Sequence, residues 1–155
     1  MAPLEVTSIE ELRELIGKEL GPTEWLEVTQ ADIDKFAEVS RDDQWIHVDV
    51  ERAKTESPFG TTIAHGNLTL SMIDGLRLAL IKSTGFKLGV NYGWNKVRFP
   101  APVPAGSRIR GSAEVVEVEE VRDGWWQIVT RFKLEVEGSE KPACVADSVG
   151  RALPE

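Results

Sequence analysis

The stretch Gly66–Ile81, GNLTLSMIDGLRLALI, is the longest segment of this chain with helical spacing of its apolar residues. Those residues lie on more than one face of a helix, which predicts a helix that is largely buried. From Gly85 onward the pattern changes to alternating and β-branched residues. One long buried helix followed by several strands indicates the α+β class.

Four segments after Gly85 are predicted to form an antiparallel sheet. They are bounded by turn-forming residues, and Asp123-Gly124 is a strong hairpin signal between two of them. The predicted strands are Asn95–Phe99, Arg108–Val121, Trp125–Val136 and Ala143–Leu153. A sheet that curls around the long helix is the simplest way to bury all its faces. Periodicity alone does not separate this arrangement from other α+β sandwiches.

The residues before the long helix are predicted to form shorter elements. Serine and threonine caps, each followed three residues later by an acidic residue, mark two helix starts. The expected elements are a helix over Ser8–Leu20, a strand over Trp25–Val28, a helix from Thr29 to Ser40 and a helical turn over Glu51–Lys54. We expect one domain of residues 1–155, in which residues 1–22 are an N-terminal helical extension.

Composition excludes several classes of function. The net charge is -8, whereas a protein that binds nucleic acid needs clustered lysine and arginine. Cys144 is the only cysteine, so the chain has no internal disulfide, which suits a reducing compartment. No apolar run approaches the roughly 20 residues that span a bilayer. We therefore expect a cytoplasmic protein with no nucleic-acid partner and no membrane span.

The segment Phe36–Ser71 contains both histidines, His47 and His65, together with Asp42. Histidine titrates near neutrality and can take or give a proton, while a nearby carboxylate can hold the second hydrogen of a water molecule. Gly66 begins the long helix, and free N–H groups at a helix start favour negative charge. These groups can together activate water and polarise a carbonyl, which is the chemistry of a hydratase.

The residues Ser40-Arg41-Asp42-Asp43-Gln44-Trp45-Ile46-His47, followed by Ala64-His65-Gly66, resemble the signature of the MaoC-like hydratases, also called R-specific enoyl-CoA hydratases. These are proteins of the hot-dog fold. Three stretches of the sequence are similar to those of a subgroup related to nodulation protein N, namely DDQWIHVD, PFGTTIAHG and NYGWNKVRFPAPVPAGSRIRG. The likeness runs from about Val28 to Gly111. Three positions depart from the commoner Gly, Asn and Pro of the signature, namely Arg41, Gln44 and Trp45.

The resemblance implies a homodimeric hot-dog protein that hydrates trans-2-enoyl-CoA to (R)-3-hydroxyacyl-CoA, or catalyses the reverse dehydration. By resemblance, Asp42 and His47 are the catalytic pair, and which of them takes the proton stays open. Gly66 would supply the oxyanion contact. We also assign to the oxyanion and substrate site His65, Asn67, Ser71 and Asp74. His65 could instead be structural and hydrogen-bond a buried carbonyl beside the site, and Asn67 could merely help to cap the helix. No cofactor is expected, because coenzyme A is part of the acyl-CoA thioester substrate.

Two further groups of residues carry expectations of their own. Asp74 stands where some relatives have serine, and we expect it to face the acyl cavity near Asp42 and to raise the proton affinity of the local carboxylates. The open alternative is that Asp74 points to solvent or to an arginine. Lys96 and Arg98, together with arginines of the next strand, are candidates to bind coenzyme A phosphates. The alternative is a solvated face.

A metal site and a serine-nucleophile site fit these residues less well. Mixed aspartate and histidine ligands can bind zinc or iron, but no metal-binding spacing is present, so no metal is predicted. The residues concerned are Asp42, Asp43, His47, Asp49 and His65. A serine nucleophile is weaker still, because the chain has no Gly-x-Ser-x-Gly turn. A hot-dog acyl-CoA thioesterase and a non-catalytic acyl-thioester-binding domain stay as alternatives.

Overall fold

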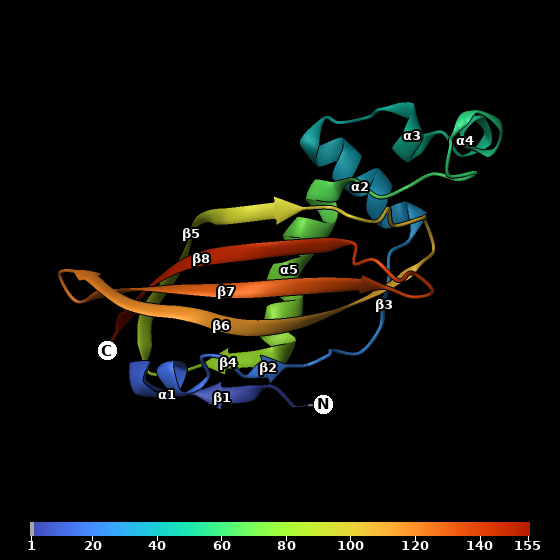
Figure 1. Ribbon diagram of the computed structural model, residues 1–155. Helices are drawn as coiled ribbons and strands as arrows, with labels where there is room; N and C mark the ends of the chain where they lie inside the picture. Colours follow the sequence, from blue (N-terminus) through green and yellow to red (C-terminus); the bar gives the residue numbers. More distant parts are fainter. Residues whose placement is uncertain (1) are drawn as a thin grey trace.

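The computed structural model describes residues 2–155, which form an antiparallel sheet with one long helix against it (Figure 1). The helix, α5, covers Gly66–Leu80 and runs behind the four long strands (Figure 1). These strands are β5 (Phe86–Arg98), β6 (Arg108–Arg122), β7 (Trp125–Val136) and β8 (Cys144–Pro154). The α+β class and the placement of a long helix on a sheet, both predicted from the sequence, are confirmed.

The sheet has the order β2-β6-β7-β8-β5, with β5 at one edge. Two short strands, β2 (Glu19–Leu20) and β3 (Leu26–Glu27), both pair with β6. The register between β5 and β8 shifts within Asn91–Gly93 and again within Trp94–Val97. Such bulges bend a strand, and β5 is visibly bent (Figure 1). The predicted strand Asn95–Phe99 is therefore only the last part of a much longer one.

The core lies between α5 and the inner face of the sheet. Buried leucine and isoleucine side chains of α5 meet buried side chains of β6 and β7. They are Leu68, Ile73, Leu76 and Leu80 from the helix, with Ile109, Val115, Phe132 and Leu134 from the strands. Each such side chain contributes about 1.5–3 kcal/mol when it leaves water.

One face of α5 is not covered. Ser71, Asp74 and Gly75 are exposed, and Leu78 keeps 62% of its surface accessible. The prediction of a largely buried helix is therefore wrong for this face, because the sheet of one chain curls over only part of the helix.

The N-terminal segment covers the core at the C-terminal end of α5. β1 (Leu4–Val6) pairs in parallel with β4 (Ile81–Ser83), and α1 (Ile9–Glu14) adds Ile9 and Leu12 to the core. The predicted helix over Ser8–Leu20 is wrong beyond Glu14, because Gly17 takes a left-handed conformation with φ of 82° and the chain turns into β2. Within residues 2–22, the predicted helical extension thus consists of one helix and two short strands, and Met1 lies outside the described residues.

Three short helices stand over the opposite end of the sheet, next to the start of α5 (Figure 1). They are α2 (Gln30–Ser40), α3 (Trp45–Val48) and α4 (Val50–Glu56). The predicted cap of α2 is confirmed, since the side chains of Thr29 and Asp32 each accept a hydrogen bond from the other's backbone N–H. Among residues 2–155, no helix is long and apolar enough to cross a membrane.

Strand β5 presents an apolar edge to its surroundings. It pairs with β8 on one side only, and Leu88, Val90 and Tyr92 are between 42% and 64% exposed. Leu78 of α5 lines the same cavity as Leu88 and Val90, so the uncovered helix face and the strand edge form one surface. Proteins rarely leave a long edge strand with exposed apolar side chains unpaired. This surface supports the expectation of a homodimer, which stays a prediction.

We predict that light scattering at micromolar concentration will give twice the mass of one chain. The double substitution Leu88→Lys and Val90→Lys should yield a monomer, because it places two charges in the proposed contact. Val39→Lys is the control, since Val39 is 82% exposed on α2, away from β5. A parent protein with the mass of a single chain would contradict the prediction.

Candidate active site

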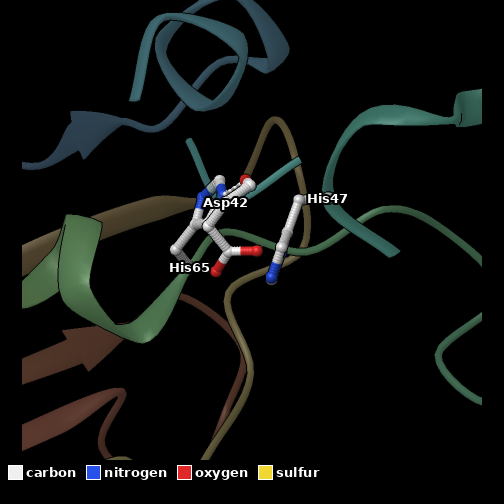
Figure 2. Close-up of side chains that lie close together, drawn as sticks. All are labelled: Asp42, His47 and His65. Atoms are coloured by element: carbon white, nitrogen blue, oxygen red, sulfur yellow. Dashed lines mark hydrogen bonds between the residues drawn. The ribbon is translucent and has the colours of Figure 1, made fainter. Parts of the chain in front are cut away.

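Three elements bring one carboxylate and two imidazoles together at the start of α5. Asp42 follows α2, His47 belongs to α3, and His65 is the residue that caps α5. One possible ligand atom from each side chain lies within 4.8 Å of the others. Figure 2 shows the three side chains grouped beside the first turn of α5. Residues 23 positions apart in sequence thus share one small site.

The turn after α2 places Asp42 in its exposed position. Arg41 ends the helix with φ of 68°, a left-handed conformation that costs a non-glycine residue about 1–2 kcal/mol. The hydroxyl of Ser40 then accepts a hydrogen bond of 3.2 Å from the Asp42 backbone N–H. Glycine, which is commoner in the resembling signature, takes this conformation without strain. The departure at Arg41 therefore affects the backbone that carries Asp42.

His47 presents one free ring nitrogen. Its Nδ1 lies 2.7 Å from the Ile63 carbonyl oxygen. Because a carbonyl can only accept, Nδ1 carries the hydrogen and donates it. In the neutral ring the other nitrogen, Nε2, then has a lone pair and no proton. His47 is therefore oriented to accept a proton at Nε2.

His65 is held differently and is almost completely buried, with 2% of its surface exposed. Its Nε2 donates to the backbone carbonyl of Asp42 over 2.8 Å. The ring stacks on that of His47, with 3.8 Å between centroids and 23° between planes, and Phe36 packs against it at 4.9 Å. Its Nδ1 has no hydrogen-bond partner among the described residues. A buried polar atom without a partner costs about 1–3 kcal/mol.

The stacked rings do not favour a shared metal ion. Ring nitrogens bind a metal through lone pairs that lie in the ring plane. Because the planes of His47 and His65 are nearly parallel and their centroids lie 3.8 Å apart, these lone pairs do not converge on one point nearby. A proton-transfer role for these three groups stays a prediction.

The start of α5 offers two free backbone donors. Within residues 2–155, no acceptor bonds the N–H of Gly66 or Asn67, whereas the next two N–H groups reach the His65 carbonyl. A Cβ atom at Gly66 would lie 2.9 Å from ring carbons of Phe99. The glycine is thus needed for packing against Phe99, and the first turn keeps donors available for an anion.

A polar link behind the site was not predicted from the sequence. The amide nitrogen of Gln30 donates to the His47 backbone carbonyl over 2.8 Å, and its amide oxygen accepts from the Thr62 hydroxyl over 2.5 Å. Thr62 is 1% exposed. Gln30 therefore joins α2, α3 and the segment that leads into α5. The sequence gives little indication of this role, since a glutamine in the first turn of a helix is usually solvated.

The other residues assigned to the site lie around its border. Asn67 and Ser71 are exposed on α5, and the Ser71 hydroxyl donates to the Leu68 carbonyl within the helix. Lys96 and Arg98 are exposed near the end of β5, and neither forms an ion pair with a described residue. Their roles stay predictions.

The arginines of β6 do not join Lys96 and Arg98. Two strands separate β6 from β5, and both arginines are already paired, Arg108 with Glu137 and Arg110 with Glu135. The hydrogen bond from Arg108 lowers the pKa of the Glu137 carboxyl. The expected cluster of four bases is therefore wrong.

Asp74 lines a cavity of about 490 Å³ between α5 and the strands β5 and β8. Asp42, His47 and His65 do not line this cavity. Asp74 lies eight positions after Gly66 on α5, which is roughly 12 Å along a helix axis. The cavity part of the expectation agrees with this position, but closeness to Asp42 within one chain is not seen. A role of Asp74 in the chemistry stays a prediction.

Comparison with known proteins shows the family to which this chain belongs. The family described as MaoC like domain matches residues 11–136. The chain belongs to the MaoC-like family. It is 48% identical over 144 residues to 3-hydroxyacyl-thioester dehydratase Z of Mycobacterium tuberculosis, covering 93% of this chain and 95% of that protein. It is 42% identical over 143 residues to Nodulation protein N of Rhizobium leguminosarum bv. viciae, covering 90% and 88%.

A solved structure confirms the fold. The monoamine oxidase regulatory protein from Archaeoglobus fulgidus superposes with a TM-score of 0.80 at 27% identity, covering 100% of this chain and 99% of that one. The MaoC-like chain thus has the hot-dog fold expected from the resemblance. It is an enzyme of the hydratase and dehydratase class, which confirms that part of the sequence-based interpretation.

We predict that Gln30→Ala will lower the free energy of unfolding of this MaoC-like protein by about 1–3 kcal/mol, because the Thr62 hydroxyl and the His47 carbonyl lose their partner. Urea unfolding followed by tryptophan fluorescence measures the change. Gln44→Ala is the control, since Gln44 is exposed and its side chain forms no hydrogen bond with the described residues. Equal free energies of unfolding for the two variants would show that the hydrogen bonds of Gln30 do not stabilise the protein.

Proposed function

We propose that this protein adds water across the double bond of a trans-2-enoyl thioester to give the (R)-3-hydroxyacyl thioester, and that it catalyses the reverse dehydration. The observation that carries the proposal is the free Nε2 of His47 beside the Asp42 carboxylate, at a helix start with unused N–H donors. The Mycobacterium relative is a 3-hydroxyacyl-thioester dehydratase by name, which supports the same substrate class. The (R) configuration follows from the resemblance.

The reaction needs one base, one acid and one site for negative charge. A water molecule between Asp42 and His47 loses a proton to His47 Nε2 while its oxygen bonds to C3. The π electrons move to C2 and onto the thioester oxygen. C2 then takes up the proton held by the pair, so the enzyme gains no proton overall. The carboxylate of Asp42 accepts the second hydrogen of the water and fixes its direction.

In the proposed reaction the thioester oxygen binds at the start of α5. Charge on this oxygen grows as water adds to C3, and the N–H groups of Gly66 and Asn67 are free to donate to it. The helix dipole adds a favourable field at the same point. In the proposed reaction Asp42, His47 and the first turn of α5 act as base, acid and oxyanion contact, and coenzyme A enters only as part of the substrate.

Assembly completes the proposal. The cavity that contains Asp74 opens beside the exposed edge of β5 and the uncovered face of α5. A second copy on this surface would close the cavity and enclose an acyl chain. We therefore propose a homodimer whose acyl pockets lie near the interface between the two chains.

One assay separates the proposed reaction from its alternatives. The protein is mixed with crotonyl-CoA, and enoyl absorbance and free thiol are followed together, with longer chains used if the short one is inert. Loss of enoyl absorbance without thiol supports hydration, whereas thiol release indicates a thioesterase and no change indicates a binding domain. Cys144 does not disturb the thiol reading, because it is fully buried and burial raises its pKa to about 11.

Asp42→Asn and His47→Ala are each expected to lower turnover by at least ~10²-fold, the usual loss when a general acid–base group is removed. Steady-state kinetics with crotonyl-CoA measures the change, and far-ultraviolet circular dichroism checks the fold. Asp43→Asn is the matched control, since Asp43 is exposed next to Asp42 and lies outside the trio. A folded Asp42 or His47 variant with parental turnover removes that residue from the mechanism.

Gly66→Ala is expected to lower turnover by up to about 10²-fold, because the new methyl group displaces Phe99 or the first turn of α5. Phe99→Leu in the same chain should restore most of the activity, since the methyl group points at the Phe99 ring rather than away from it. Phe99→Leu alone serves as the control. If the double variant folds normally but stays as slow as Gly66→Ala, the methyl group acts on the substrate and not on Phe99.

A further inference from the structure

His65 has a feature that packing alone does not explain. It is 2% exposed, yet its Nδ1 has no donor or acceptor within hydrogen-bonding distance in residues 2–155. A histidine that served only to fill space would be replaced without loss by an apolar ring. Buried polar atoms without partners are uncommon in native structures and call for a specific cause.

The two contacts of His65 both reach the proposed catalytic pair. Its Nε2–H donates to the backbone carbonyl of Asp42, the residue whose carboxylate faces the water site. Its ring face lies 3.8 Å from that of His47, which leaves the His47 ring no freedom to tilt in that direction. Phe36 contacts the His65 ring at 4.9 Å and holds it in place.

The hydrogen bonds also define the protonation of both rings. His65 must carry its hydrogen on Nε2 to donate to Asp42, and a second hydrogen on Nδ1 would meet no acceptor. In the neutral ring the hydrogen is therefore on Nε2 and Nδ1 has a lone pair. When His47 takes a proton at Nε2, the resulting cation lies against the face of a neutral aromatic ring, an arrangement that favours positive charge. A charged His65 in the same stack would repel it.

We propose that His65 is a positioning residue of the hydration reaction. It fixes the backbone of Asp42 through one hydrogen bond and the ring plane of His47 through stacking. The inference rests on the proposed function for its kinetic consequences. Its structural consequences, the tautomers of two rings, can be observed whether or not the protein turns over a substrate.

Two substitutions separate the two contacts. His65→Phe keeps an aromatic ring against His47 and removes the donor to Asp42. His65→Gln keeps an amide donor and removes the ring. We expect each to lower kcat by about tenfold or more with KM changed less than twofold, and His65→Ala to lower kcat by roughly 10²-fold, the scale of a small misplacement of reacting groups. Phe132→Leu is the packing control, since Phe132 is fully buried on β7 and belongs neither to the trio nor to the cavity lining, and it should lower stability and leave kcat near the parental value.

The chain has only two histidines, so a long-range ¹H–¹⁵N spectrum assigns both rings from one variant. The parent should show His47 protonated at Nδ1 and His65 protonated at Nε2 alone. In His65→Ala the His47 nitrogens should move towards the averaged shifts of a ring that exchanges tautomers. A parent His65 with a proton on Nδ1 overturns the proposal. So do folded Phe and Gln variants with parental kcat, provided that the parent is an active hydratase.

Discussion

The packing of α5 against a sheet with one apolar face is the constraint on which the rest of the molecule depends. Four long strands bend around the helix, and bulges in β5 supply part of the bend. The N-terminal segment then closes one end through Ile9 and Leu12. What stays open is the exposed edge of β5 with the adjoining face of α5. The shape of the sheet thus determines where the core is covered by the chain itself and where an apolar surface stays exposed.

The same packing makes the start of the helix a rigid place for the proposed chemistry. α5 is held along its length by the core, so its first turn is a rigid support with free N–H groups. Phe99 presses on Gly66 from one side. His65 sits at the cap position and reaches back to Asp42. The proposed catalytic pair, Asp42 and His47, is therefore positioned by contacts to a helix that the core holds along its length.

Sequence reasoning could find the elements whose signals are local. The length of α5, the Asp123-Gly124 hairpin and the cap of α2 by Thr29 all depend on neighbouring residues, and each is seen in the structure. The first half of β5 was missed, because its pairing with β8 compensates for two glycines and several polar residues. The structural reading of His65, a hydrogen bond to a carbonyl beside the site, agrees with its contact to Asp42, but the identity of that carbonyl could not be foreseen, since a backbone partner leaves no trace in residue type.

The helices α2, α3 and α4 join the main body at few points. The segment 28–65 is tied to residues 103–107 by backbone hydrogen bonds at its two ends, from Val28 to Ser107 and from Ala64 to Val103, for example. Between these ties its helices are short and largely exposed. Segments of this kind open at lower free energy than a paired sheet. On heating, enzymatic function should therefore disappear at a temperature at which the sheet is still intact, and cooling from that point should restore it.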